Sequence, residues 1–309
     1  MIEFNSIFLS AMIESWGGTA HVQNSVPDEA GKIRTVLEET TAMYDAVLII
    51  AGSSAGSEDF TFRVIEESGE VFVHGVAIRP GHPVVLGVTN SVPVVGLPGY
   101  PASASITSEL FVKSMIREFT GEIFDDGDFV LAKLARKIHS PMGDEEFLRV
   151  TVGRIDYAYV ATPTARGAAM TLAMSRSDGI VRISADSEGV DEGEEIKVAL
   201  VRPRHLIDKT VIVSGSHDIA LDVLGSKFSE LPGSAKMVST NVGSVGGLLA
   251  LSKGYAHIAA SHLLDEDTGE YNVGSIKRHL DGIEVSLSLI HISEPTRRYA
   301  ISYAVFCLK

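Results

Sequence analysis

Residues 46–59 read AVLIIAGSSAGSED and decide the fold of the first part of the chain. The uninterrupted apolar run from Ala46 to Ala51 is typical of a strand buried on both faces of a sheet. The Gly/Ser loop from Gly52 to Asp59 follows it, and a helical pattern then continues to about Ser68. At this position, the carboxyl end of a strand, backbone N–H groups and the next helix can receive an anion. A plain strand-to-helix turn fits equally well, because the loop has neither a Walker A nor a GxGxxG pattern.

The flanking sequence alternates between helical and extended patterns. We expect helices at about 5–16, 27–43 and 103–119, the first of them capped by Asn5. Strands are expected at about 19–23, 71–76, 84–88 and 92–95. This alternation predicts a parallel sheet with helices on both faces, that is, a three-layer α/β domain over residues 1–122.

The pattern changes after Gly121. Residues 123–203 hold short segments rich in β-branched residues and separated by turn residues, which predicts a small β-barrel-like domain. From Leu206 the alternation of strands and helices returns, so residues 204–286 are expected to form another, partial α/β lobe.

Composition restricts the class of protein. The chain has 309 residues and a formal charge of −14, which argues against nucleic acid or an anionic membrane as a partner and allows carboxylates with a divalent cation. No stretch reaches the roughly 18–20 apolar residues of a membrane helix, and the N-terminus lacks the basic start of a secretory signal. The single cysteine, Cys307, excludes an internal disulfide. We therefore expect a cytoplasmic protein.

Two further loops are candidates for the same sheet edge. Arg79 and His82 flank a Pro-Gly turn where both side chains could contact phosphate, although a solvated surface turn fits this segment alone somewhat better. Residues 96–104, GLPGYPASA, form a rigid loop in which Ser103 is expected to cap the next helix. We expect all three loops to cluster at one edge of the sheet.

The three motifs AGSSAGSEDF, GEVFVHGVAIRPGHP and GLPGYPASA together resemble the molybdopterin molybdenumtransferase family, of the MoeA and gephyrin E-domain type. Residues 3–5 are similar to the family's Asp-x-Asn motif, with Glu3 in place of Asp. The resemblance extends to about Arg202 and includes Arg166-Gly167 and Ser177-Asp178-Gly179. The family's two N-terminal domains are not in this sequence, so the resemblance implies a piece that is inactive alone.

The resemblance implies a reaction and a site. Molybdate would be inserted into adenylylated molybdopterin with release of AMP, assisted by Mg²⁺, in a homodimer, with a molybdopterin adenylyltransferase as a candidate partner. Glu3 and Asp59 would be catalytic, close enough to share the cation. The substrate-binding residues would be Gly52, Ser53, Ser54, Gly56, Arg79, His82, Pro98, Gly99, Pro101 and Ser103.

Several positions depart from the family pattern. Arg79 and His82 replace two lysines, and His82 is neutral near pH 7 unless a phosphate stabilises its cation. Tyr100 replaces the usual Asn, and Ala168 stands where many members have Ser. These differences concern rate and substrate rather than fold.

Residues 204–286 resemble part of a periplasmic-binding-protein-like domain. Its serine loops suggest an oxyanion site with Ser214, Ser216, His217 and Ser244, the serines standing between strands and helices. His217 and His262 also fit ordinary polar positions, and for His257 a structural role is favoured. Without a second lobe, Leu248, Leu249 and Leu251 are expected to be poorly covered.

Residues 287–309 resemble the translation of a sequencing-library adapter, and we expect this tail not to join the core. The alternative is a genuine C-terminal strand. For the function, the alternatives to molybdenum insertion are a molybdopterin adenylyltransferase, which would not need the β-rich domain, and a non-catalytic sensor of molybdate, tungstate or another oxyanion. Molybdate and tungstate are tetrahedral dianions of similar size, so sequence does not separate them.

Overall fold

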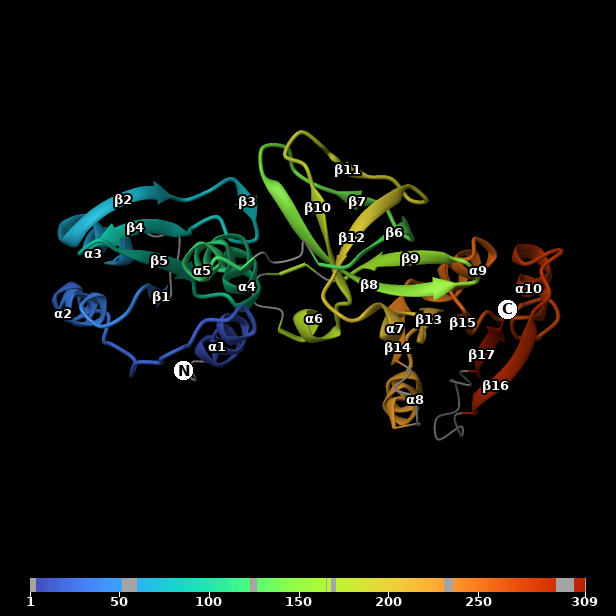
Figure 1. Cartoon of the computed structure of the whole chain (residues 1–309). Coiled ribbons are helices and arrows are strands. Elements are labelled where there is room, and N and C mark those ends of the chain that lie inside the picture. The colour runs from blue at the N-terminus through green and yellow to red at the C-terminus, as the bar shows by residue number, and fades with distance from the viewer. Residues whose placement is uncertain are drawn as a thin grey trace.

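The computed structural model describes residues 4–51, 60–122, 127–164, 166–167, 171–230, 236–292 and 303–308. Three units follow one another along the molecule: an α/β unit, here the first domain, a β-barrel, and a second α/β unit, here the third domain (Figure 1). The fold is thus mixed α/β, as the sequence predicts. No helix in the described ranges is both long enough and apolar enough to span a bilayer.

The first domain is built on a four-stranded sheet of order β1-β5-β4-β2. Its elements are α1 (Asn5–Ser15), α2 (Ala30–Thr41), β1 (Val47–Ala51), α3 (Phe60–Ser68), β2 (Gly69–His74), β4 (Val85–Thr89), β5 (Val92–Pro98), α4 (Pro101–Thr107), the π-helical turn η1 (Ser108–Val112) and α5 (Lys113–Thr120). Successive residues of β5 pack on opposite faces: Val95 joins Leu9, Leu97 and Ile116, whereas Val94 joins Leu37 and Ile65. Helices therefore cover both faces, and the three-layer prediction is confirmed.

The prediction of a parallel sheet is wrong for the described strands. Only β1 and β5 pair in parallel, whereas β4 pairs antiparallel with both β5 and β2. The turn between β4 and β5 explains part of this. Asn90 and Ser91 both have positive φ, 53° and 66°, and a two-residue turn can join only antiparallel strands.

The prediction of a strand at 19–23 is also wrong: residues 18–28 form neither helix nor strand. Val22 is 63% exposed, so the segment has little apolar burial to hold it against a sheet.

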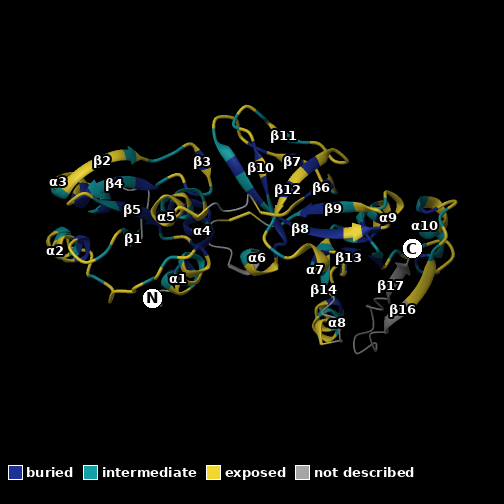
Figure 2. Ribbon diagram, in the orientation of Figure 1, coloured by how far each residue is buried: buried dark blue, intermediate teal, exposed yellow. Residues whose placement is uncertain are grey.

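The middle unit is a closed barrel, as predicted. Its strands are β6 (Phe129–Leu134), β8 (Glu145–Ile155), β9 (Ala158–Pro163), β10 (Gly179–Ile183) and β12 (Glu195–Leu200), in the order β10-β12-β6-β9-β8 with β8 returning to β10. A small ribbon of β7 (Ile138–His139) and β11 (Gly189–Val190) and the helix α6 (Thr171–Arg176) complete it. Burial alternates along β6 and β8, so one side chain in two enters the core. Figure 2 colours the buried residues of the barrel strands dark blue.

The first domain and the barrel are joined by β3 (Ile78–Arg79). This two-residue strand pairs in parallel with Glu145 and Glu146 of β8. The segment that contains Arg79 and His82 is therefore held at the junction between the two units.

The third domain has a five-stranded sheet of order β14-β13-β15-β17-β16. Its elements are α7 (Arg204–Ile207), β13 (Thr210–Gly215), α8 (Ile219–Ser229), β14 (Lys236–Asn241), α9 (Gly243–Ser252), β15 (Ile258–Ser261), α10 (Val273–His279), β16 (Ser286–Ile292) and β17 (Tyr303–Leu308). The expectation that Leu248 and Leu251 are poorly covered is wrong, because both are 0% exposed under α10 and its flanking residues. Only Leu249, at 41%, faces out.

The expectation that the tail stays apart from the core is also wrong. β17 pairs antiparallel with β15 through Ile258↔Leu308 to Ser261↔Val305, and with β16 on its other side. Pairing needs only an open strand edge and residues of high β-propensity, which Tyr303, Val305 and Phe306 provide. It does not depend on where the sequence comes from, so the adapter resemblance of 287–309 remains a hypothesis.

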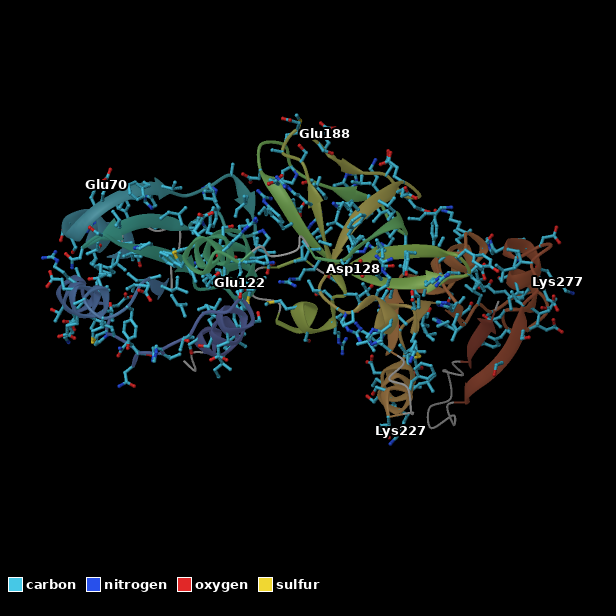
Figure 3. All side chains as sticks on the ribbon, viewed as in Figure 1. Glu70, Glu122, Asp128, Glu188, Lys227 and Lys277 are labelled. Atoms are coloured by element: carbon cyan, nitrogen blue, oxygen red, sulfur yellow. The ribbon has the colours of Figure 1, made fainter. Side chains whose placement is uncertain are left out.

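Polar contacts fix the third domain against the barrel. Arg204 pairs with Asp128, which Figure 3 labels near the middle of the molecule, with 3.0 Å between Nε and Oδ2. His257 Nδ1 accepts a hydrogen bond from the Ile212 N–H, and its Nε2 donates to the Arg154 carbonyl, each at 3.0 Å. His257 is thus structural, and burial lowers its pKa against the opposing effects of the Arg154 carbonyl and Asp156.

Stability should consequently depend on pH through His257. Its folded-state pKa is lowered, so below the unfolded value near 6.5 the unfolded chain binds more protons than the folded chain, and stability falls as the pH falls. We expect the urea midpoint to drop between pH 7.5 and pH 5, and to drop less in His257→Gln, which retains a donor and an acceptor. An equal drop in both proteins would contradict this assignment.

Candidate functional site

Strand pairing brings the predicted loops to one edge of the first domain's sheet. Ala51 and Pro98 are partners at the carboxyl ends of β1 and β5. Val85 of β4 pairs antiparallel with Gly96, so the segment 79–83 that precedes β4 reaches the same edge. The segments 79–83 and 96–101 therefore lie at one edge, where β1 also ends. The prediction that 96–101 is a loop is wrong for most of it, because Gly96–Pro98 continue β5 and Pro101 begins α4.

Several predicted site residues lie outside the described residues. They are Glu3, Gly52, Ser53, Ser54, Gly56 and Asp59. The expected sharing of a cation by Glu3 and Asp59 therefore stays a prediction. Within the described ranges, no group of three or more His, Cys, Asp and Glu side chains is placed to hold a metal ion.

The short connection between β5 and α4 is held by α1. The buried Asn5 side chain donates from Nδ2 to the Gly99 carbonyl at 2.7 Å. The prediction that Asn5 caps α1 is wrong, because the helix begins at Asn5 and Phe4 occupies the cap position. Its amide instead reaches across to the loop that follows β5 and fixes it.

The prediction that Ser103 caps α4 is wrong as well. α4 begins at Pro101, with Tyr100 in the cap position and Ser103 within the first turn. Proline is favoured at the first helical position because its fixed φ suits the helix and it has no N–H to leave unpaired. Ser103 is 4% exposed and lines the cavity described next.

A cavity of about 680 Å³ lies between the first domain and the barrel. It is lined from the first domain by Ile78–Pro83, Ala102, Ser103 and Ile106, and from the barrel by Asp144, Glu146–Arg149, Thr164, Arg166 and Gly167. The structure thus brings the predicted residues Arg79, His82 and Ser103 to one site. Pro98, Gly99 and Pro101 are not among its lining residues.

Two of the cavity's arginines are paired with carboxylates. Arg79 Nη2 lies 3.0 Å from Asp144 Oδ2, and Arg166 Nε lies 2.9 Å from Oε1 of the buried Glu146. All four residues line the cavity, so the positive charges of Arg79 and Arg166 are largely neutralised by their carboxylate partners.

Arg149 differs from both. Its Nη2 donates to Ser105 Oγ at 3.1 Å and its Nη1 to Ser177 Oγ at 3.4 Å, and none of the ion pairs formed among the described residues includes it. Burial lowers the pKa of its guanidinium, and Glu109 opposes this effect. Arginine nevertheless stays charged in proteins. A half-buried cation without a carboxylate partner, facing a cavity, is suited to bind an anion.

Sequence reasoning did not single out Arg149. The available signal was weak: Arg149 is one charged residue on the outward face of a strand whose alternate residues are buried. Such residues are common on solvated strands, and only the docking of the first domain makes this one face a cavity.

The third domain gathers a second polar cluster at the carboxyl edge of its parallel strands β14, β13 and β15. Ser216 Oγ lies 2.8 Å from Ser244 Oγ, and Ser244 Oγ lies 3.2 Å from His262 Nδ1 and accepts from the His262 N–H at 3.0 Å. The predicted Ser214 is a buried residue of β13 itself and does not follow the strand. His217 lines a surface cavity along α8, beside Asp218. His262 therefore lies with the expected Ser216 and Ser244, whereas the sequence left open whether His262 has a role in this site.

Comparison with known families covers all three units. Residues 2–118 match the family described as "Probable molybdopterin binding domain", and residues 131–201 match the MoeA C-terminal region (domain IV). The first two domains are MoeA-like. Residues 225–295 match a PBP superfamily domain, which agrees with the predicted solute-binding-protein-like lobe.

Individual proteins show the same likeness. A Methanocaldococcus jannaschii protein named for molybdopterin biosynthesis is 31% identical over 65% of this chain and 48% of its own length. The molybdopterin molybdenumtransferase 2 of Mycobacterium tuberculosis is 26% identical over 63% of this chain and 50% of its own length. The chain thus spans about half the length of these relatives.

Among solved structures, a MoeA protein from Pyrococcus horikoshii superposes with a TM-score of 0.55 at 32% identity, covering 66% of this chain and 49% of that one. A molybdenum cofactor biosynthesis protein from Pyrococcus furiosus gives a TM-score of 0.52 at 30% identity, covering 64% of each chain. The likeness therefore holds for the fold of the MoeA-like domains as well as for their sequence.

One residue of the cavity wall, Gly81, is packed too closely to carry a side chain without strain. Gly81 has φ +120°, and a Cβ there would lie 2.8 Å from Thr107 Cγ2. We expect Gly81→Ala to lower the free energy of unfolding by about 2–4 kcal/mol, from backbone strain and overpacking. Gly143→Ala is the matched control, because Gly143 has φ +98° with nothing within 4 Å of an added Cβ, so only the strain remains. Equal losses in urea unfolding would show that the contact with Thr107 is unimportant.

Proposed function

We propose that residues 1–203 are the substrate-binding part of a molybdopterin molybdenumtransferase, and that the cavity between the first domain and the barrel binds the molybdate oxyanion. The observation that carries this proposal is the Arg149 guanidinium, which faces the cavity without a carboxylate partner among the described ion pairs. The MoeA-like domains support the same substrate class.

Different residues of the chain would bind different groups of the substrates. Arg149 would supply the charge that holds an oxyanion, and Ser103 and His82 offer hydrogen-bonding groups on the opposite wall. The Gly/Ser loop 52–59 would receive the phosphate of adenylylated molybdopterin at the same sheet edge. The proposed overall reaction inserts molybdate into the dithiolene of that substrate and releases AMP.

Mg²⁺ would be held by Glu3 and Asp59, hard oxygen donors of the kind this ion prefers. When bound, it would neutralise phosphate charge. The proposed setting is a cytoplasmic homodimer, with a molybdopterin adenylyltransferase as a candidate partner.

The presence of the barrel disfavours the first alternative, a molybdopterin adenylyltransferase. That activity needs only the α/β unit, whereas here the barrel contributes half of the cavity wall and its unpaired cation. The second alternative, an oxyanion sensor, finds support in the Ser216, Ser244 and His262 cluster. Because this cluster stands at the start of α9, where N–H groups and the helix dipole favour anions, we propose it as a second oxyanion site.

The first test removes the Arg149 charge. Charged hydrogen bonds are worth about 1.5–3 kcal/mol, so Arg149→Met should weaken molybdate binding about tenfold to hundredfold in isothermal titration. Arg182→Met is the control, because Arg182 is a barrel arginine whose side chain is 70% exposed and paired with Glu145. The titration is done in a Ser244→Ala background to exclude the third domain. Unchanged affinity in Arg149→Met would overturn the proposal.

The second test addresses the third domain. In an Arg149→Met background, molybdate binding by the third domain should be lost with Ser244→Ala, which leaves only the weakened cavity site, and should persist with Ser229→Ala, whose hydroxyl donates to the Ser226 carbonyl on α8. Differential scanning calorimetry should show the matching loss of ligand-induced stabilisation. If Ser244→Ala binds as well as its parent, the second site is wrong.

A further inference from the structure

One lysine of the third domain bonds to the barrel next to Ser177, a hydrogen-bond partner of the cavity residue Arg149. Lys236, the first residue of β14, donates from Nζ to Asp178 Oδ1 at 2.9 Å and to the Arg176 carbonyl at 2.6 Å. Its side chain is only 21% exposed. A lysine loses hydration when it is buried, so this placement requires specific partners.

The first partner, Asp178, is completely buried and fixed without Lys236. Its Oδ1 also accepts from Arg202 Nη1 at 2.7 Å, and its Oδ2 accepts from the Val152 N–H at 3.0 Å. The carboxylate therefore serves as a rigid anchor for the lysine. Loss of Lys236 would leave Asp178 paired with Arg202, so the barrel itself should stay folded.

The second partner leads to the cavity. Arg176 is the last residue of α6, and Ser177 follows it. Ser177 Oγ donates to the Met174 carbonyl at 2.9 Å and accepts from Arg149 Nη1 at 3.4 Å. A hydrogen bond to the Arg176 carbonyl thus restrains the peptide that carries Ser177, and with it one of the two described acceptors of the Arg149 guanidinium.

We propose that Lys236 is a positioning residue for Arg149, through which the third domain helps to shape the oxyanion site of the other two. The inference rests on the proposed function of the cavity, because it assigns Lys236 to the same anion-binding guanidinium. It makes the third domain part of this site even though none of the cavity's lining residues comes from it.

A second lysine provides the matched control. Lys253 of the third domain also bridges to the barrel, through Glu192, but neither residue lines the cavity or contacts α6 in any described hydrogen bond. Lys253→Met therefore removes an ion pair between the same two units and leaves the Arg176–Ser177 peptide untouched.

The test is molybdate titration by isothermal calorimetry on the full chain, with Ser244→Ala as background. We expect Lys236→Met to weaken binding about tenfold, Lys236→Arg to stay within about threefold of the parent, and Lys253→Met to leave binding unchanged. Melting temperatures measured alongside separate folding from positioning. If Lys236→Met melts much earlier than Lys253→Met, Lys236→Gln replaces it, because the amide still fills the site with a neutral donor.

The outcomes distinguish this inference from the proposed function. If Arg149→Met loses binding while Lys236→Met and Lys236→Gln bind like the parent, Lys236 has no positioning role and the oxyanion site stands. If Lys253→Met weakens binding as much as Lys236→Met, the effect is general domain docking and the inference is overturned. If the parent does not bind molybdate, or Arg149→Met binds equally well, the proposed function itself fails.

Discussion

The candidate site depends on one short pairing between backbones, that of Ile78 and Arg79 with Glu145 and Glu146 of β8. This pairing holds the first domain's loop edge against the outer face of the barrel, and the cavity lies between them. Neither unit encloses the space alone. The first domain contributes a tight loop and a helix start, whereas the barrel contributes most of the charged side chains, including Arg149 and Arg166.

The charges around the cavity are arranged unequally. Where an arginine forms an ion pair with a carboxylate, as Arg166 does with Glu146, the two charges neutralise each other and attract a ligand only weakly. Arg149 instead meets two hydroxyl groups, which orient its guanidinium without cancelling its charge. An arrangement of this kind keeps one full positive charge available in a partly desolvated place, where it interacts more strongly with an anion than it would in water.

Much of the fold could be predicted from the sequence, because it follows from local patterns. The apolar run that became β1 and the closely spaced strands of the barrel stand where they were expected, whereas Gly96–Pro98, expected in a loop, extend β5. Strand direction was harder, since the turn at Asn90 and Ser91 looks like an ordinary polar loop until its φ values are known. Motifs pointed to three residues that line the cavity, Arg79, His82 and Ser103, whereas Arg149 and Lys236 were not singled out, because only the docking of domains gives them the positions on which the proposals rest.

The strand β8 bears more constraints than any other described strand, and this has a consequence for how the site could change over time. It pairs with β9, β10 and β3 at once, so its register is set from three sides. Successive residues of a strand point to opposite faces. A slip of one residue would therefore turn Arg149 into the hydrocarbon interior and bring Val150 to the cavity, exchanging the charge for a methyl surface. A single insertion or deletion in β8 would therefore remove Arg149 from the cavity unless a β-bulge absorbed it, whereas substitutions at fixed positions leave the register intact.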